Sequence, residues 1–344
     1  YKINRLKRGA ALILTFLILT ILVVLVLQLA YSSKMDERLV KNHQDNTQNY
    51  YTLRSGLQLA KLVLEDDLKN SKYDSLKEIW ASKEKMASLA LGKSQLSMEI
   101  EDLERKINLN LLADKKWKTV IEGQLKRLCK ALQLSEDIAL AIVDYIDEDK
   151  EGKFEKYQHN KPIQSLDDLL VLDNVDKKVL YGDTSLYPPQ KGLAPFLALM
   201  GNGKININTA SKEVLMALDD KITEEKADEI LQHRQEKPFE KTEDLKQIPD
   251  LDKLFSSNPP QNEGEGNSGN NNGSPPDGNQ GGGSEGNSSQ KDEKPPSFQD
   301  QITVQSSYFQ VLIKSQTGSM AQKATAYLYR DSKNVYFLYW NQSK

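Results

Sequence analysis

The fold of this chain is decided by residues 7–30, which read KRGAALILTFLILTILVVLVLQLA. Between Ala10 and Ala30, only two threonines and one glutamine interrupt alanine and large hydrophobic residues, and there is no charge. At about 1.5 Å per residue, a helix of this length spans roughly 30 Å, the thickness of the hydrocarbon core of a bilayer. We therefore expect a transmembrane helix over residues 10–30. Four basic residues and no acidic residue precede it, which places the N-terminus in the cytoplasm and the chain after Tyr31 across the membrane.

Three kinds of N-terminal segment have this composition. A secretory signal peptide has a shorter apolar core and a small-residue cleavage site, of which Leu29-Ala30-Tyr31 is a poor version. An uncleaved signal anchor fits the hydropathy. A prepilin-type leader, residues 1–9, would be cleaved between Gly9 and Ala10 on the cytoplasmic side, so that the helix stays on the mature protein. The chain begins at Tyr1 rather than at methionine, which leaves open whether part of such a leader precedes it.

The composition describes an acidic exported protein. The chain has 344 residues, so residues 31–344 have room for two or three small domains. The formal net charge of −3 becomes −7 when the four positive charges before the apolar run are removed. Because nucleic-acid binding depends on cationic contacts to phosphate, we expect no nucleic-acid partner. Cys129 is the one cysteine in the sequence, so no intrachain disulfide can form.

The helical pattern continues beyond the membrane segment. Residues 31–48 are polar and contain neither proline nor glycine. After them, apolar residues recur every three or four positions, which is typical of one buried stripe on an amphipathic helix. The sequence favours one long helix, half in lipid and half packed on the exported domain, and a separate helix after a short break is the alternative. The stripe consists of Tyr50, Leu53, Leu57, Ala60, Leu64 and Leu68.

Strand patterns lie near both ends of the exported region. We expect strands at residues 96–103, 308–313, 324–330 and 335–340, with a hairpin turn at 331–334. A sheet of this kind needs a helix on one face, and the N-terminal helix is the natural cover. We therefore assign residues 31–114 and 298–344 to one pilin-like α/β domain. Residues 257–297 are rich in Gly, Asn and Ser without large apolar residues, and we expect them to be disordered.

The middle of the chain contains an internal repeat. Residues 161–169, KPIQSLDDL, align with residues 237–245, KPFEKTEDL, and apolar positions on both sides keep the same spacing. Each copy is too small to bury much surface alone, so we expect the two units to pack together. The predicted fold class is therefore α+β: a long N-terminal helix and an antiparallel sheet, with a two-unit α-helical domain inserted at residues 115–254.

Taken in chain order, these features resemble protein K of the bacterial type II secretion system, the large minor pseudopilin. The resemblance implies a structural role without catalysis, at the tip of a periplasmic pseudopilus whose assembly the protein helps to initiate for protein export. It also implies a single-pass inner-membrane anchor and three kinds of partner: the I- and J-type minor pseudopilins, the pseudopilus and prepilin peptidase. The matching segments are Arg8 to Ile13, Ile100 to Asp102, Lys106 to Asn110, Pro162 to Leu169, Lys204 to Ser211 and the aromatic C-terminal strands.

The fifth residue after Gly9 sharpens the resemblance. Most pilin-like subunits have a glutamate there, which neutralises the N-terminal amine of a neighbouring subunit. This chain has Leu14, as members of the K family lack that glutamate. A carboxylate in an apolar membrane segment is costly without a partner, so its absence fits a subunit with no neighbour above it.

The repeated units also resemble the SAM-like or helix-hairpin-helix units of DNA-binding proteins. Such units hold phosphate with backbone N–H groups at a glycine-containing hairpin. The corresponding turns here are residues 218–223 and 134–137. Neither turn contains glycine, and each contains two acidic residues. A scaffold role is therefore favoured, and a membrane-anchored periplasmic DNA-binding protein is the alternative function.

The densest carboxylate cluster predicts a metal site. Residues 147–152 match the first, third, fifth and sixth positions of a calcium-binding loop, but the twelfth position is Gln158 rather than glutamate. The resemblance to protein K implies calcium in the helical domain, and a solvated acidic helix end is the alternative. The candidate ligands are Asp144, Asp147, Asp149 and Glu151.

No arrangement typical of an enzyme is present in the sequence. The three histidines lie on polar stretches, and there is no phosphate-binding loop, zinc-ligand spacing or cofactor motif. We therefore expect no catalytic residues and no organic cofactor.

Overall fold

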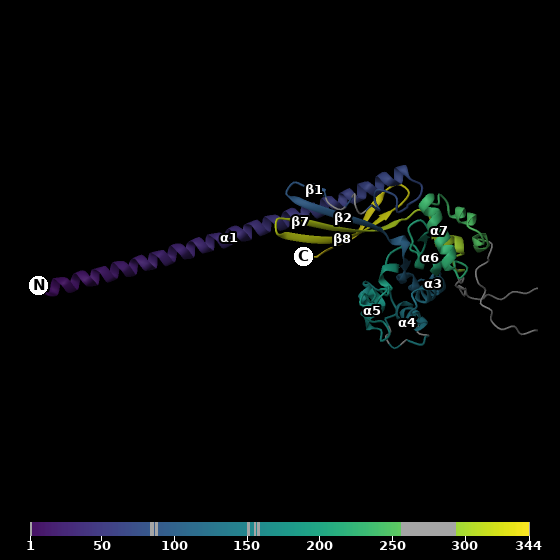
Figure 1. Cartoon of the computed structure of the whole chain (residues 1–344), viewed down its shortest axis with the longest axis horizontal. Helices are drawn as coiled ribbons and strands as arrows, with labels where there is room; N and C mark the ends of the chain where they lie inside the picture. The colour runs from purple at the N-terminus through teal and green to yellow at the C-terminus, as the bar shows by residue number, and fades with distance from the viewer. Residues whose placement is uncertain are drawn as a thin grey trace, which may run out of the picture.

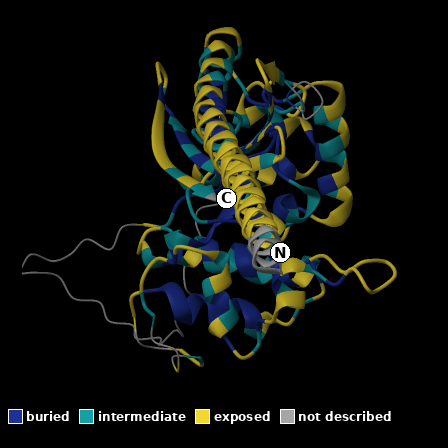
Figure 2. Cartoon of the chain, turned by 90° about the vertical axis from the view of Figure 1, so that its left-hand side faces the viewer, coloured by how far each residue is buried: buried dark blue, intermediate teal, exposed yellow. Residues whose placement is uncertain are grey.

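The computed structural model describes residues 2–82, 86, 89–149, 152–154, 156, 159–255 and 294–343. Its longest element is the helix α1 (Lys2–Asn70). This helix confirms the prediction of one long helix, rather than two helices separated by a short break. The first half of α1 projects far from the rest of the molecule (Figure 1). All side chains from residue 11 to residue 44 are exposed (Figure 2). Within the described residues, α1 is the one helix long and apolar enough to cross a membrane.

The second half of α1 lies on an antiparallel sheet. The predicted strands are present, and the turn at residues 331–334 is closed by Asp331, whose Oδ1 accepts hydrogen bonds from the backbone N–H groups of Lys333 and Asn334. A short first strand, which the sequence analysis did not predict, adds an edge. In spatial order the strands are β1 (Leu89–Leu91), β2 (Ser94–Asp102), β7 (Tyr308–Thr317), β8 (Met320–Arg330) and β9 (Val335–Ser343).

The contact between helix and sheet is the first of two hydrophobic cores. The helix approaches the sheet closely at Gly56, where an added Cβ would lie 2.8 Å from Cγ2 of Ile313. Trp80, from the loop after α1, closes the core with an edge-on contact to Phe309 at 5.4 Å between ring centroids. The apolar stripe predicted for α1 supplies Leu53, Leu57, Ala60 and Leu64, which pack with Leu96, Met98, Ile100, Val311 and Ile313.

A helical head beyond the sheet contains the second core (Figure 1). The head consists of several short helices, and Pro162 and the capping box of Ser165 and Asp168 start a separate 3₁₀ turn within it. Apolar residues from Ile107 to Ile302 share this core. The helices are α3 (Lys118–Ala131), α4 (Glu136–Ile146), α5 (Lys177–Tyr181), α6 (Lys212–Leu218) and α7 (Glu224–Glu236).

Short parallel strand pairs extend the head beyond residues 115–254. Strand β3 (Ile107–Asn108) pairs with β4 (Leu197–Ala198), and β5 (Ile205–Asn206) pairs with β6 (Ile302–Thr303). These pairs bring residues assigned above to the α/β domain into the head. Of the expected disordered linker at residues 257–297, the part up to residue 293 lies outside the described residues.

The internal repeat is visible as repeated hydrogen bonding. The side chain of Asn110 holds the backbone of Ile163 through two hydrogen bonds of 2.9 Å, and Asn208 holds Phe239 in the same way at 2.8 and 2.9 Å. In both units an aspartate three residues into the next turn then accepts two backbone hydrogen bonds. The repeat therefore begins at the sequences INLN (107–110) and ININ (205–208), upstream of the alignment found in the sequence.

Candidate functional site

The predicted cleavage point lies at the start of the long helix. Gly9 and Ala10 are within α1, and the structure describes the backbone but not the side chains there. Leu14, at the position where other pilin-like subunits have glutamate, is exposed on the membrane-length part of the helix. An apolar helix with no covering protein surface is suited to lipid or to the helices of other subunits.

Three of the four predicted calcium ligands lie at or just after the end of α4, and two of them contact one lysine. Lys118 Nζ is 2.9 Å from Asp147 Oδ2 and also contacts Asp149. Asp144 is turned to the other side, where its Oδ2 accepts a 2.7 Å hydrogen bond from the backbone N–H of Phe154. Glu151, the fourth predicted ligand, lies outside the described residues. The lysine supplies a positive charge to the site, so the carboxylates are not left unneutralised.

Two oxygen atoms in this segment have no hydrogen-bond partner among the described residues. They are Oδ1 of Asp147 and Oδ1 of Asn160, and both are buried. Burial raises the pKa of Asp147, although Lys118 opposes this shift. The chain also passes very close here, because a Cβ on Gly152 would lie 2.3 Å from the Asp144 carboxylate. Buried oxygen donors without partners are a donor set that fits a hard cation such as calcium.

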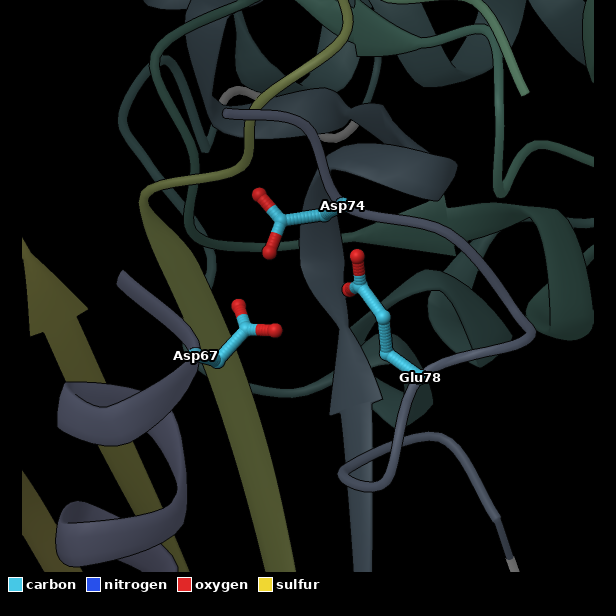
Figure 3. Close-up of side chains that lie close together, drawn as sticks. All are labelled: Asp67, Asp74 and Glu78. Carbon is cyan, nitrogen blue, oxygen red and sulfur yellow. The ribbon is translucent and has the colours of Figure 1, made fainter. Parts of the chain in front are cut away.

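A second carboxylate cluster, which the sequence analysis missed, lies where the sheet meets the head. Asp67 is near the end of α1, and Asp74 and Glu78 follow in the next loop. One oxygen from each of the three lies within 4.8 Å of the others, and the carboxylates face one another (Figure 3). We call these three residues the junction cluster. It could hold a metal ion.

Arg330, the last residue of β8, is the cationic partner of the junction cluster. Its Nη1 is 2.9 Å from Asp67 Oδ2, and its Nη2 contacts Asp74 Oδ2. Its guanidinium also lies over the ring of Phe309, at 4.8 Å from the centroid. The arginine side chain is 1% exposed, so it is the largest charged group in the protein interior among the described residues. The signal in the sequence was an arginine ending an apolar strand.

The junction cluster has three carboxylates but only one cationic partner, Arg330, among the described residues. Burial raises the pKa of Asp67 to about 8, with the carboxylates of Glu78 and Asp74 adding to the shift and Arg330 opposing it. Burial likewise raises the pKa of Glu78, against hydrogen bonds from Ser75 N–H and Trp80 Nε1. The charged forms of these carboxylates are therefore held in the protein at a cost.

Further carboxylates connect the junction cluster to the head. Asp102, at the end of β2, accepts hydrogen bonds from the hydroxyl groups of Thr209, at 2.5 Å, and Ser306, at 2.7 Å. Burial raises its pKa to about 6. Burial, reinforced by Asp102, raises the pKa of Glu104 well above its ordinary value. The boundary between sheet and head is thus rich in buried acids.

Arg127 of α3, which lies beside the turn at residues 218–223, is already engaged with protein groups. Arg127 donates from Nε to the carbonyl of Ala217 at 2.8 Å and from Nη2 to that of Leu218 at 2.9 Å. These are the last carbonyls of α6, so the guanidinium caps a helix rather than facing solvent phosphate. Asp220 lies 3.6 Å from the same guanidinium and would repel phosphate. This geometry argues for a scaffold role of the helical pairs.

Comparison with known proteins gives a family match on part of the chain and a fold match over most of it. The family model described as Type II secretion system (T2SS), protein K matches residues 205–263, from β5 through the end of the second repeated unit. No curated protein gives a significant match. A chain in the crystal structure of the GspK-GspI-GspJ complex from enterotoxigenic Escherichia coli has the same fold, with a TM-score of 0.58 and 18% identity. The match covers 89% of this chain and 99% of that one. The chain is therefore similar to type II secretion system protein K over its second repeated unit, and it shares its overall fold with the Escherichia coli chain.

Proposed function

We propose that this chain is a minor pseudopilin that forms part of the tip of a type II secretion pseudopilus, together with I- and J-type subunits. The observation that carries the proposal is the division of α1, whose first half is apolar and exposed while its second half is buried on the sheet. A subunit of this shape can exchange lipid for the helices of neighbouring subunits without unfolding. The similar Escherichia coli chain comes from a complex named for GspK, GspI and GspJ.

The helical head supports a position at the end of the filament. It lies at the far end of the molecule from the membrane-length part of α1 (Figure 1). A subunit stacked above would have to accommodate this head, whereas a terminal subunit has nothing above it. Leu14 fits the same position, because a terminal subunit has no amine of a neighbour to neutralise. In this proposal the two repeated units act as SAM-like scaffolding, and the role is assembly rather than catalysis.

The proposal includes cleavage of a prepilin-type leader between Gly9 and Ala10. It follows that the N-terminus is cytoplasmic before cleavage, that the protein spans the inner membrane once, and that sheet and head are periplasmic. Coexpression with prepilin peptidase, followed by mass spectrometry of the membrane fraction, tests it. We expect a mature protein starting at Ala10, and an uncleaved protein for Gly9→Leu. If an active peptidase does not cleave the N-terminus, residues 1–30 are an ordinary signal anchor and the proposal is contradicted.

We also propose that the predicted segment at the end of α4 binds calcium, through carboxylates among Asp144, Asp147, Asp149 and Glu151. The buried, unpartnered Oδ1 of Asp147 supports this proposal. Calcium would then hold the end of α4 to the chain that follows. The expected result is a rise in melting temperature with added calcium that Asp147→Asn reduces. An equal rise in Asp147→Asn and in the wild type would contradict it.

A further inference from the structure

We propose that the junction cluster is a second, separate site for a divalent cation of the calcium or magnesium type. The ion would be held by Asp67, Asp74 and Glu78, where α1, the sheet and the head meet. This inference does not depend on the proposed role at a filament tip. It rests on the orientation of the carboxylates, on one buried oxygen and on the balance of charge.

The buried oxygen is Oδ1 of Asp74. The residue is 1% exposed, and its other oxygen, Oδ2, already accepts from Arg330 and from the backbone N–H of Ser306 at 2.6 Å. Oδ1 has no hydrogen-bond partner among the described residues. Figure 3 shows one oxygen of the Asp74 carboxylate turned toward Asp67 and Glu78, which offer further oxygens. A buried acceptor facing two acids is costly unless a cation or a proton lies between them.

The balance of charge favours a divalent ion. Three carboxylates face one guanidinium, so the set has two uncompensated negative charges when all are ionised. Arg330 is largely engaged already, because Nε and Nη2 also donate to the carbonyl of Ser306, at 3.2 and 2.8 Å. An ion of charge +2 makes the set neutral.

The donor set is held in place before any ion binds. Glu78 accepts hydrogen bonds from the hydroxyl of Ser71 at 3.1 Å, from the backbone N–H of Ser75 at 3.1 Å and from Trp80 Nε1 at 2.7 Å. Oxygen ligands from carboxylates are those that calcium and magnesium prefer. A pocket of about 440 Å³, lined in part by Asp67 and Glu78, gives an ion a route from solvent.

A cation bound at the junction cluster would couple α1 to the helical head. Asp67 belongs to α1 and Arg330 to β8, whereas the neighbours of Asp74 extend into the head. Asn206 donates from Nδ2 to the hydroxyl of Ser306 at 2.7 Å, and the backbone N–H of Ser306 donates to Asp74. Binding would therefore fix the orientation of the head relative to α1, rather than stabilise the head internally as the α4 segment would.

Terbium luminescence tests the proposal, because terbium replaces calcium and is excited by a nearby tryptophan. The indole of Trp80 is hydrogen-bonded to Glu78, so it is beside the site. The experiment uses the full chain in detergent, excited at the tryptophan band and titrated with terbium and then with competing calcium. The variants are Glu78→Gln and Asp74→Asn, made in wild type and in an Asp147→Asn background, so that the α4 segment and its adjacent Trp117 do not contribute. Asp66→Asn is the matched control, since it removes a neighbouring exposed carboxylate outside the junction cluster.

We expect Glu78→Gln and Asp74→Asn each to weaken terbium and calcium binding by about 100-fold or more, since losing even an outer partner of a metal ligand costs about 10- to 100-fold. Asp66→Asn should bind as the parent does. Far-UV circular dichroism establishes that each variant is folded, and Glu78→Gln, at a partly exposed position, serves if Asp74→Asn does not fold. Unchanged binding in a folded Glu78→Gln variant, or no sensitised emission in the Asp147→Asn background, would overturn the proposal. Neither result bears on leader cleavage or on assembly with other pseudopilins.

Discussion

The two carboxylate clusters of this protein are built alike but sit in different surroundings. At the end of α4, Asp147 and Asp149 share the ammonium group of Lys118, whose side chain is 29% exposed. At the junction cluster, Asp67 and Asp74 share the guanidinium of Arg330, which is 1% exposed. Water can therefore solvate the lysine if its partners are lost, whereas nothing but protein surrounds the arginine. The comparison teaches that burial of the base, rather than the number of acids, sets how much each cluster matters for stability.

Removing Arg330 is the most severe way to test this difference. Arg330→Leu leaves two buried carboxylates without their cation, and breaking a buried pair in this way costs about 3–5 kcal/mol. We expect a loss of that size in the free energy of unfolding, measured by chemical denaturation of the full chain in detergent. Lys323→Leu, at an exposed position on the same strand, is the control and should change stability by less than about 0.5 kcal/mol. A loss below about 1 kcal/mol in Arg330→Leu would mean that the junction is not a buried ion pair.

Asp102, which lies next to the junction cluster, should make the stability of the protein depend on pH. Its pKa is about 6 in the folded protein and near 3.8 when unfolded, so the folded state holds the proton more tightly. This contribution to stability is fully present below pH 3.8 and is lost as the pH rises through about 6. Asp102→Asn, which cannot ionise, should therefore gain stability relative to wild type between pH 4 and pH 7, by about 2–3 kcal/mol.

Melting curves of Asp102→Asn and wild type across that pH range provide the measurement. Asp114→Asn, which removes an exposed carboxylate at the start of the head, is the control and should show a constant difference from wild type. The carboxyl groups of Glu104 and Asp74, which face Asp102, are present in both proteins. Parallel melting profiles for Asp102→Asn and wild type would show that Asp102 ionises normally.

Removing Lys118 should have the smallest effect of the three. Its pair with Asp147 is partly exposed on the lysine side, and such pairs contribute about 0–1 kcal/mol. We expect Lys118→Met to lower the free energy of unfolding by about 1 kcal/mol and to increase calcium affinity, because the competing ammonium group is gone. Calorimetric titration with calcium measures the second effect, with Lys116→Met, an exposed neighbour, as the control. A loss as large as that of Arg330→Leu would remove the distinction between the clusters.

The sequence predicted those features that depend on local periodicity. The stripe from Leu53 to Leu64 identified the buried face of α1, and the alternating aromatic strands with a turn at Asp331 identified the C-terminal meander. The long helix and the antiparallel sheet are confirmed, and the comparisons agree with the resemblance. The helix and the strands could be found because each depends on a periodic pattern within one continuous segment of the chain.

The junction cluster could not be found in this way. Asp67 reads as part of the polar last turns of a helix, and Arg330 as the end of a strand, and 263 positions separate them. Their association depends on α1 crossing the sheet with its last turn beside the end of β8. The carboxylates at residues 144–151, by contrast, predicted a metal site because they lie close together in the sequence. The INLN and ININ sequences at residues 107 and 205 are nearly 100 positions apart, and the hydrogen bonds of Asn110 and Asn208 show that they begin the two repeated units.

The most direct test of the proposed role is assembly with defined partners. The full-length chain would be coexpressed with prepilin peptidase and with I- and J-type minor pseudopilins of the same secretion system, extracted in detergent and purified through a tag on this chain alone. We predict one complex that contains the three mature subunits in equal amounts, measured by native mass spectrometry. A folded and cleaved chain that purifies without either partner, while those partners still associate with each other, would contradict the proposal that it completes the tip of the pseudopilus.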